Sequence, residues 1–504
     1  MAGGVSKAGA VDGVARDGAG GGATGSAGLV YGGAYLPRAE LEDRAARSAA
    51  ALAAQGIGEG DVVALMLYNR PEWLELMLAC RMLGAYWCPI NWHFKSEEVR
   101  HILADSGAKL LVAEPGLYAG ERVVHDWPAL RARHAPWEGP GRAPRLGMFY
   151  TSGTTGRPKG VRRVPPAPAD APRLAELARQ AWRIALGFEP GVRALVSAPL
   201  YHSAPNSYAL QAILHDATLW LEPKFDAEAT LALIARERIT HAYMVPTMFA
   251  RLLKLPEAVR ARYDISSMRF VISMGAPCAP EVKRGMIEWW GPVIHESYAA
   301  SEFGLVTFIT GAEALERPGS AGRALPSASV KVLDRAGREL PAGEIGLIYA
   351  RNHAYPDFTY AHNDAARRAI DRDGLCTLGD MGYLDADGYL YVCDRDSDMV
   401  ISGGVNIYPA EIEAALVTMP GVADCAVFGI PDAEFGESLA AAVQPQPGAR
   451  LQAGAVQAWL RERLAGYKVP RVVEFMDSLP REDSGKIFKR RLKQPWWEGS
   501  GRRI

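Results

Sequence analysis

Short apolar runs alternate with amphipathic segments along most of the chain, and this alternation restricts the fold more than any other feature. Residues 71–83 repeat apolar side chains at helical spacing, and Asn69 is expected at the start of that helix. Ligands of parallel α/β sheets bind beyond the carboxyl ends of the strands, where we expect the chemistry. The alternation predicts an α/β fold whose strands include the runs 62–67, 109–113, 194–197, 241–245 and 269–273.

A change of pattern near residue 394 divides the chain into a long and a short portion. A polar break at 394–398 follows the strand predicted at 389–392. The remaining length suits a small domain, in which we predict helices at 410–417 and 453–464 and a strand at 425–429. We therefore expect a flexible leader at 1–28, an N-terminal domain at 29–395, a hinge near 395–398 and a C-terminal domain at 396–504.

Composition argues against several classes of protein. The formal net charge of −1 does not indicate nucleic acid or an anionic membrane as a partner. No run reaches the ~18 uninterrupted apolar residues of a membrane span. The six cysteines contain no C-x-x-C pair and lie mostly among apolar residues, which favours reduced thiols over a zinc site. The Gly- and Ala-rich leader lacks the apolar core of a secretory signal, so we expect a cytoplasmic protein.

Residues 151–160, Thr-Ser-Gly-Thr-Thr-Gly-Arg-Pro-Lys-Gly, are typical of a phosphate-binding loop. The glycines let the backbone approach an anion, the hydroxyls offer donors, and Lys159 adds positive charge. A polar hairpin turn is the alternative, although a turn rarely needs so many interleaved hydroxyls and glycines. The loop does not match the Walker spacing, because two residues separate Gly156 from Lys159. This mismatch argues against ordinary γ-phosphoryl transfer.

The loop and the motifs after it strongly resemble, in order, those of the adenylate-forming superfamily of acyl-CoA synthetases, peptide-synthetase adenylation domains and firefly-type luciferases. The resemblance implies a large N-terminal domain of stacked mixed sheets with helices plus a β-rich portion, and a small mobile α+β C-terminal lid. In this family the loop holds the phosphates of ATP that leave as pyrophosphate. The ATP contacts so implied are Thr151, Ser152, Gly153, Thr154, Thr155, Gly156, Lys159, Gly275, Ala276, Pro277, Tyr298, Ser301, Asp380 and Arg395.

Residues 199–203 resemble the family motif that guards the acyl pocket, with His202 as its imidazole. A lone histidine is more often structural, but its place between a strand end and this motif favours a function. Ala299 replaces the family's usual glycine, and its methyl group is expected to narrow the pocket. Apolar and small side chains indicate an uncharged acyl or aryl body, and the implied pocket residues are His202, Val245, Met274, Ala299 and Ala300.

Residues 298–302, Tyr-Ala-Ala-Ser-Glu, resemble the family's Tyr-Gly-x-Thr-Glu motif. The resemblance implies that Tyr298 packs on adenine and that Ser301 contacts the α-phosphate. It also implies that Glu302 binds Mg²⁺, although outside this context a surface acid would be the simpler interpretation. Asp380 lies in the position of the family's Thr-Gly-Asp despite the extra Leu378, and we expect it to accept hydrogen bonds from the ribose hydroxyls.

The family motifs continue through the predicted hinge. Arg395 resembles the arginine that contacts ribose at the domain junction. Ser397 occupies the hinge position where the family commonly carries Asp or Lys. Gly403 and Gly404 resemble the backbone that lines the family's pantetheine tunnel, so we expect them to bind coenzyme A.

Lys486 ends a Pro-x-x-x-x-Gly-Lys motif that resembles the last motif of the family. The resemblance implies that its ammonium stabilises charge on the reacting carboxylate and the α-phosphate. Lys486, Glu302 and His202 are the expected catalytic residues. We expect Tyr467 and Lys468 to help bind coenzyme A, and the neighbouring Lys489, Arg490 and Arg491 to face solvent or its phosphates.

The resemblance implies an AMP-forming acid–thiol ligase. A carboxylic acid and Mg·ATP would form an acyl-adenylate and pyrophosphate, and the acyl group would then pass to coenzyme A. A fatty, steroid side-chain or aromatic acid is expected. The alternative is a stand-alone adenylation enzyme that loads a carrier protein, although residues 201–205 contain no acid for an ammonium group. A luciferase-like oxygenase and a non-catalytic nucleotide-binding regulator are further alternatives, and the sequence leaves a homodimer open.

Overall fold

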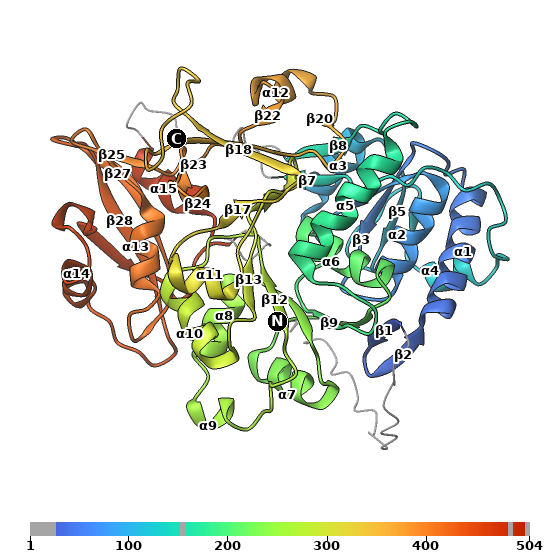
Figure 1. Ribbon diagram of the computed structural model, residues 1–504, viewed down its shortest axis with the longest axis horizontal. Coiled ribbons are helices and arrows are strands. Elements are labelled where there is room, and N and C mark those ends of the chain that lie inside the picture. The colour runs from blue at the N-terminus through green and yellow to red at the C-terminus, as the bar shows by residue number, and fades with distance from the viewer. Residues whose placement is uncertain (1–26, 152–157, 482–486, 499–504) are drawn as a thin grey trace, which may run out of the picture.

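A seven-stranded sheet forms the centre of the molecule in the computed structural model, which describes residues 27–151, 158–481 and 487–498 (Figure 1). Neighbouring strands are parallel except at the edge, where β2 pairs antiparallel with β1. In sheet order the strands are β13 (Ile294–Glu296), β12 (Phe270–Ser273), β11 (His241–Met244), β9 (Arg193–Val196), β10 (Thr218–Leu221), β1 (Gly28–Tyr31) and β2 (Ala34–Pro37).

A second parallel sheet contains β4 (Tyr86–Pro89), β3 (Val62–Met66), β5 (Ala108–Ala113) and β6 (Val123–Val124) in that order. The helix α2 (Glu72–Leu83) contacts β4 on this sheet and also α6 (Ser203–Leu214), which packs on β9 and β10. Apolar side chains of both sheets and α2 form one continuous core. The stacked arrangement of sheets and helices that the resemblance implies is therefore confirmed.

Other helices surround these two sheets and extend to residue 369. None of the described helices has both the length and the apolar character that crossing a membrane would require. The helices that surround the two sheets are α1 (Arg38–Ala54), α3 (Ser96–Ser106), α4 (Trp127–Arg131), α5 (Ala171–Leu186), α7 (Ala227–Glu237), α8 (Pro246–Leu253), α9 (Glu257–Arg260), α10 (Pro280–Trp290), α11 (Gly311–Glu316) and α12 (Asp364–Ala369).

The β-rich portion follows, as expected, and its main sheet is antiparallel. Its strands are β16 (Thr307–Phe308), β17 (Gly322–Ala324), β24 (Tyr389–Arg395), β23 (Asp380–Leu384), β19 (Gly346–Asn352), β22 (Leu375–Cys376) and β21 (Asp371–Arg372), with β18 (Ala328–Leu333) paired to β19. Two smaller antiparallel groups are β20 (Phe358–Tyr360), β8 (Lys159–Arg163) and β7 (Phe149–Thr151), and the hairpin of β14 (Ala299–Ala300) and β15 (Gly304–Leu305).

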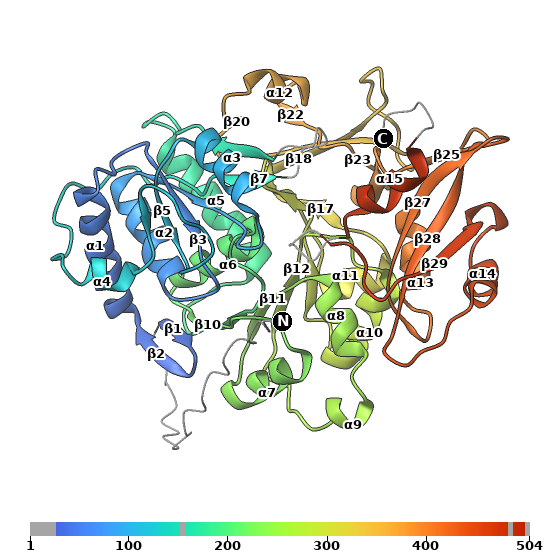
Figure 2. The same cartoon turned by 180° about the vertical axis from the view of Figure 1, so that it is seen from behind.

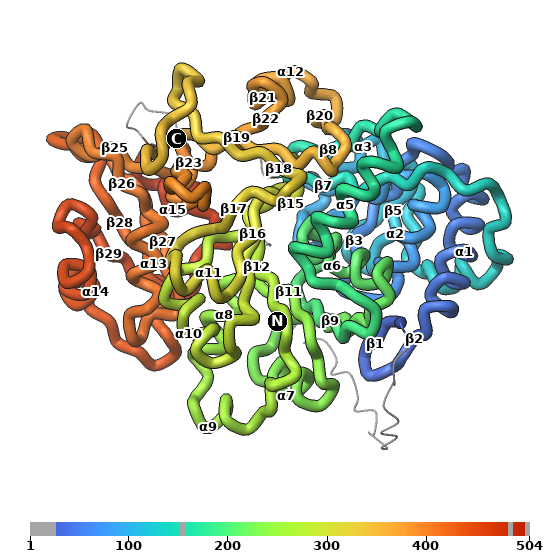
Figure 3. Tube along the Cα trace, in the orientation of Figure 1, coloured from blue at the N-terminus to red at the C-terminus, as the bar shows by residue number. Residues whose placement is uncertain are grey.

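The last part of the chain has apolar cores of its own and lies to one side of the molecule (Figure 2, Figure 3). One core gathers residues between Val400 and Val469, and the other lies on the opposite face of the same sheet. Its elements are β25 (Val400–Ser402), β26 (Val405–Ile407), α13 (Pro409–Leu416), β27 (Val422–Asp432), β28 (Gly436–Pro445), α14 (Ala453–Arg461), a 3₁₀ turn (Gly466–Lys468), β29 (Val472–Phe475) and α15 (Lys489–Trp497).

Several predicted boundaries are wrong because pairing partners extend or shorten the elements. The strand predicted to end at residue 392 continues to Arg395, because Asp394 pairs with Met381 and Arg395 with Asp380. The strand predicted at 425–429 is the centre of the longer β27, which pairs with β28 over almost its whole length. Gly28, assigned to the leader, belongs to β1 and pairs with Thr218.

Asn69 does not start α2, which begins at Glu72 after Pro71. Its amide instead bonds to two other loops. Nδ2 donates to the carbonyls of Ala198 at 2.9 Å and Glu222 at 3.0 Å, and Oδ1 accepts from the Leu200 N–H at 2.9 Å. This buried side chain therefore joins the loops that follow β3, β9 and β10, and it anchors the segment that leads to His202.

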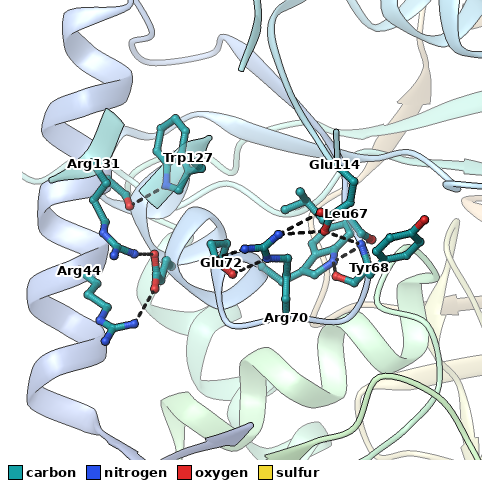
Figure 4. Close-up of polar contacts among 11 residues, drawn as sticks. Arg44, Leu67, Tyr68, Arg70, Glu72, Glu114, Trp127 and Arg131 are labelled. Carbon is teal, nitrogen blue, oxygen red and sulfur yellow. Dashed lines mark hydrogen bonds and ion pairs between the residues drawn. The ribbon is translucent and has the colours of Figure 1, made fainter. Parts of the chain in front are cut away.

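Glu75 on α2 is a charged side chain at zero exposure inside the N-terminal core. Its carboxylate is paired with Arg131, and Arg44 Nη1 lies 3.5 Å from Oε1. Figure 4 shows Arg44 and Arg131 directed at the same carboxylate from two different elements. Burial raises the pKa of Glu75, and the charge of Arg131 opposes that shift. The two contacts of Glu75, with Arg44 on α1 and Arg131 on α4, thus join both helices to α2.

Replacing Glu75 with alanine leaves Arg131 in a largely buried site without its partner. We expect Glu75→Ala to lower the free energy of unfolding by about 3 kcal/mol, the scale of a broken buried ion pair. Urea denaturation followed by tryptophan fluorescence measures this loss. The control is Glu97→Ala on the exposed face of α3, which should cost less than about 0.5 kcal/mol. Equal small losses in the two variants would contradict the role given to Glu75.

His241 and His295 lie buried on either side of Phe270, with ring centroids 5.6 Å and 4.1 Å from that ring. His241 Nε2 lies 3.1 Å from the Gly187 carbonyl oxygen, and its Nδ1 lies 2.9 Å from Thr240 Oγ1. Burial lowers the pKa of each imidazole to about 4. Both rings therefore stay neutral in the folded protein at pH 5, whereas the unfolded chain binds protons there.

Stability should consequently fall as the pH is lowered from 6.5 toward 4, because only the unfolded state gains protons in that window. Each buried histidine should contribute a loss of about 2 kcal/mol between pH 7 and pH 5. Urea midpoints at the two pH values measure it, and His241→Gln should lose less stability than the wild type. His362→Gln, at an exposed position, should retain the full wild-type dependence. An unchanged dependence in His241→Gln would refute this prediction.

Candidate active site

The predicted phosphate loop joins β7 to β8, which form an antiparallel hairpin. Thr151 at the end of β7 pairs with Lys159 at the start of β8. Lys159 Nζ lies 5.3 Å from the ring centroid of Tyr360 on β20. A hairpin and a phosphate loop are therefore compatible interpretations of this segment. The remaining predicted contacts in the loop lie outside the described residues: Ser152, Gly153, Thr154, Thr155 and Gly156.

Glu302 lies directly beside this hairpin and is only 4% exposed. Its Oε1 accepts hydrogen bonds from Thr151 Oγ1 at 3.0 Å and from the Tyr360 hydroxyl at 3.2 Å. Burial raises the pKa of the carboxyl, whereas these two hydrogen bonds and the more distant charge of Arg163 lower it. A buried carboxylate that accepts hydrogen bonds from two neutral hydroxyls fits a hard divalent cation, because such a cation would supply positive charge.

Arg163 is a buried cation at the end of β8 in the same hairpin. Its Nη2 donates to the Ser301 carbonyl at 2.6 Å, and its Nη1 donates to the Pro356 carbonyl at 3.0 Å. Burial lowers the pKa of the guanidinium to about 10, which still leaves it charged at neutral pH. Arg163 therefore fixes the backbone on both sides of the Glu302 site.

Three side chains from distant parts of the sequence meet here: Tyr298 between β13 and β14, Asp380 at the start of β23 and Arg395 at the end of β24. The Tyr298 hydroxyl donates to Asp380 Oδ2 at 2.6 Å, and Arg395 Nε lies 3.3 Å from Asp380 Oδ1. Asp380 and Arg395 are also direct partners in the pairing of β23 with β24. The structure thus brings together three predicted ATP contacts around one carboxylate.

His202 and Ser301 are joined through Ser203 at the start of α6. Ser301 Oγ donates to Ser203 Oγ at 2.9 Å. The Nε2 atom of His202 is buried without a hydrogen-bond partner among the described residues. Burial lowers the pKa of His202 to about 4, so its ring is neutral at physiological pH. A neutral imidazole with an unused nitrogen can accept or donate one hydrogen bond to a ligand.

The other predicted pocket residues lie at the carboxyl ends of β11 and β12 or in the β14 hairpin. Val245 precedes α8, and Met274 follows β12 with its side chain buried. The Tyr243 hydroxyl donates to the Met274 carbonyl at 3.4 Å, which holds the turn in place. Gly275, with a φ of +95°, begins an exposed turn of three predicted contacts, Gly275, Ala276 and Pro277, and Ala299 and Ala300 form β14.

The residues predicted to bind coenzyme A lie apart from this centre. Gly403 and Gly404 form the tight turn between β25 and β26, with φ values of +56° and +82°. Figures 1 and 3 show this hairpin at the outer end of the C-terminal part, well away from β7 and β8. Tyr467 is 56% exposed, and Lys468 Nζ pairs with Glu411 at 2.6 Å.

Lys486 lies outside the described residues. The expectation for Lys489, three residues later, is wrong, because its side chain is largely buried and its Nζ lies 2.9 Å from Glu413 Oε1. The physical reason is that α15 packs on β27, so this side of the helix faces the interior. Arg490 and Arg491 are exposed, as expected.

The chain around the predicted hinge is held from both sides. The Asp396 N–H donates to the Gly379 carbonyl at 2.7 Å, which belongs to the large part. Lys493 on α15 instead holds the next two residues, because its Nζ lies 3.4 Å from the Ser397 carbonyl and 3.2 Å from Asp398 Oδ1. The N–H groups of Asp398 and Met399 also donate to the Arg395 carbonyl at 2.9 Å and 3.0 Å, so both parts of the molecule contribute contacts to residues 395–399.

Sequence reasoning missed Tyr360 and Arg163 and gave no separate role to Ser203. Arg163 carried a weak signal, because a charged residue stands four positions after Lys159 in a strand that is otherwise partly apolar. Tyr360 carried no local signal at all. Its place beside Glu302 arises from the pairing of β20 with β8, two segments about 200 residues apart.

Comparisons with known proteins agree with this geometry. The family model described as AMP-binding enzyme matches residues 24–355, and that of the AMP-binding enzyme C-terminal domain matches residues 411–486. A feruloyl-CoA synthase of an Amycolatopsis species is 36% identical over 92% of this chain and 94% of its own length. An indoleacetate–CoA ligase of Aromatoleum aromaticum is 35% identical over 91% and 93% of the two chains.

Solved structures of MatB from Rhodopseudomonas palustris are also similar. The ATP-bound form superposes with a TM-score of 0.82 at 29% identity, covering 96% of this chain and 98% of MatB. The apo form gives a TM-score of 0.71 at 30% identity, covering 94% and 96%. The sequence matches and the fold together support one conclusion: the chain belongs to the AMP-binding enzyme family.

Proposed function

We propose that the protein is an acid–CoA ligase that works through an acyl-adenylate. The observation that carries the proposal is the buried Glu302 carboxylate beside the phosphate-loop hairpin, with Tyr298, Asp380 and Arg395 gathered next to it. One end of this arrangement suits a polyphosphate and the other a nucleoside. The names of the two relatives, both acid–CoA ligases, support the same reaction.

In the first half-reaction, a carboxylate oxygen of the acid attacks the α-phosphorus of ATP. The bond from that phosphorus to the bridging oxygen breaks, and pyrophosphate leaves toward the β7–β8 loop. The residues act by positioning the reactants and by stabilising charge. Tyr298 offers its ring to adenine, Asp380 accepts from the ribose hydroxyls, and Lys159 and Lys486 bring positive charge to the phosphates.

Glu302 is the residue we propose for holding Mg²⁺, with Thr151 and Tyr360 orienting its carboxylate. A bound Mg²⁺ would neutralise phosphate charge at this site. Thr151 and Tyr360 both bond to Oε1, which leaves Oε2 as the oxygen available to a cation. Arg163, fixed to the Ser301 carbonyl, keeps the backbone of the motif in register with the hairpin.

In the second half-reaction, the sulfur of coenzyme A attacks the acyl carbonyl, AMP leaves, and the thiol proton is lost. Gly403, Gly404, Tyr467 and Lys468 remain our proposed contacts for coenzyme A. Because their hairpin lies away from the nucleotide site here, they require a rotation of the C-terminal part. We propose that this part is the predicted domain 396–504 and that the rotation takes place within the hinge at 395–398, where contacts with Lys493 begin.

We further propose an aromatic acid as the substrate class. A series of ring contacts ends at His202: the centroids of Tyr68 and Trp92 are 5.0 Å apart, those of Trp92 and Tyr201 6.3 Å, and those of Tyr201 and His202 4.4 Å. Such edge and tilted contacts favour another aromatic ring as neighbour. The cytoplasm remains the proposed location, because all six thiols are unpaired and a reducing compartment keeps them so.

The test is ATP–pyrophosphate exchange and CoA-thioester formation with a panel of ferulate, indole-3-acetate, a medium-chain fatty acid, a steroid side-chain acid and an amino acid. We expect exchange and thioester formation with an aryl acid. Exchange without thioester formation would favour a carrier-protein acceptor. Failure of exchange with every acid, despite ATP binding, would favour a nucleotide-binding regulator.

Lys486→Ala should separate the two half-reactions. Loss of the ammonium removes charge stabilisation only from adenylation, so exchange should fall by about 100-fold or more. Thioester formation from supplied acyl-adenylate should stay within about twofold of the wild type, as expected for a residue outside the second step. The matched control is Arg490→Ala, an exposed cation on the same segment. Equal losses in both steps would reject this division of roles.

A further inference from the structure

We propose that Lys254 is a positioning residue that holds the C-terminal part over the nucleotide site during adenylation. The inference rests on the proposed function for its assay, but its structural basis is independent of it. Lys254 belongs to the large part of the molecule and bonds directly to the backbone of the C-terminal part. We call this contact the Lys254 clasp.

The clasp consists of two hydrogen bonds from one ammonium group. Lys254 Nζ donates to the carbonyl of Val422 at 3.1 Å and to that of Ala423 at 2.9 Å. These carbonyls lie at the start of β27, the longest strand of the C-terminal part. An ammonium carries three donors and no acceptor, so it suits two adjacent carbonyls well.

The base of the clasp is rigid. Lys254 directly follows α8, whose side chains Met248, Phe249 and Leu252 are buried in the N-terminal core. Figures 1 and 2 both show α8 on the side of the large part that faces the C-terminal part. Lys254 therefore reaches across the boundary from a fixed position.

The strand end that Lys254 holds is also linked to the segment before Lys486. Asp424, directly after the clasped carbonyls, pairs with Arg481 at 2.5 Å. Arg481 also forms an isolated bridge with Ile487. A movement of residues 422–424 would therefore also move Arg481, which lies in the segment that leads to Lys486.

Rotation about the hinge must break the clasp, because α8 stays with one part and the two carbonyls move with the other. Beside the hinge the Ala410 N–H of α13 donates to Asp394 Oδ2 of β24 at 2.9 Å, so this contact holds the two parts together close to the hinge. The clasp fixes the angle between the parts at a second point far from the hinge in sequence. The overall similarity is higher to ATP-bound MatB than to apo MatB, in agreement with the clasped arrangement being the one that binds nucleotide.

Lys254→Met tests the proposal, because methionine keeps an apolar stem of similar length and removes the donor. We expect the maximal rate of pyrophosphate exchange to fall about three- to tenfold, the scale of a lost charge-assisted hydrogen bond. The KM for ATP should change less than twofold, roughly within assay error, because the nucleotide side chains are untouched. Thioester formation from supplied acyl-adenylate should be unchanged or faster, since the C-terminal part is released more readily.

Two further variants separate positioning from general damage. Arg251→Met removes an exposed cation from the same helix and should behave as the wild type. Lys254→Arg keeps a cationic donor and should recover most of the exchange rate. Equal losses in both half-reactions, an unchanged exchange rate in Lys254→Met, or no recovery with arginine would each overturn the clasp.

A structural measurement keeps the clasp testable if the wild type shows no exchange and the proposed function fails. Cysteines can be placed at Arg251 and at Gln446, whose Nε2 lies 3.4 Å from the same Val422 carbonyl oxygen, and their joining by a short bismaleimide reagent measured. The double-cysteine protein that keeps Lys254 should be cross-linked in higher yield than the same protein carrying Lys254→Met. Equal yields would overturn the clasp whatever the activity of the enzyme.

Discussion

The buried carboxylate of Glu302 is the constraint on which the rest of the site depends. A carboxylate at 4% exposure is costly unless its charge is balanced. Here Thr151 and Tyr360 donate hydrogen bonds to one oxygen of the carboxylate, and Arg163 donates to the adjoining Ser301 carbonyl. The arrangement therefore binds the phosphate hairpin, β20 and the β14 region into one unit whose charge suits a cation and a polyphosphate.

Each of the two parts of the molecule has apolar cores of its own, and few contacts connect the parts. The N-terminal core runs through both parallel sheets, and buried pairs such as Glu75 with Arg131 lock helices onto it. The C-terminal part has separate cores. Between the two lie the proposed hinge, the contact of the Ala410 N–H with Asp394 Oδ2, and the bonds of Lys254 to Val422 and Ala423. Such sparse contacts allow one part to turn while each keeps its internal structure.

Much of the fold could be predicted from local patterns. The strands β3, β5, β9, β11 and β12 lie within one residue of their predicted limits, because a continuous apolar run determines a buried strand directly. Prediction failed where long-range pairing decides. Arg395 extends β24 only because Asp380 is its partner, and Asn69 lies outside α2 because two distant loops, after β9 and β10, satisfy its amide.

The candidate site, like the fold, could be predicted from the sequence only in part. The sequence by itself determined the family and the order of its motifs, and it predicted which residues would contact the nucleotide, because the resemblance rests on residue types in order along the chain. Only the tertiary structure decided that Tyr360 supports Glu302, that Lys489 is buried against Glu413, and that Lys254 bonds to Val422 and Ala423. These contacts join segments far apart in sequence, and their energies depend on burial and distance, which no local pattern records.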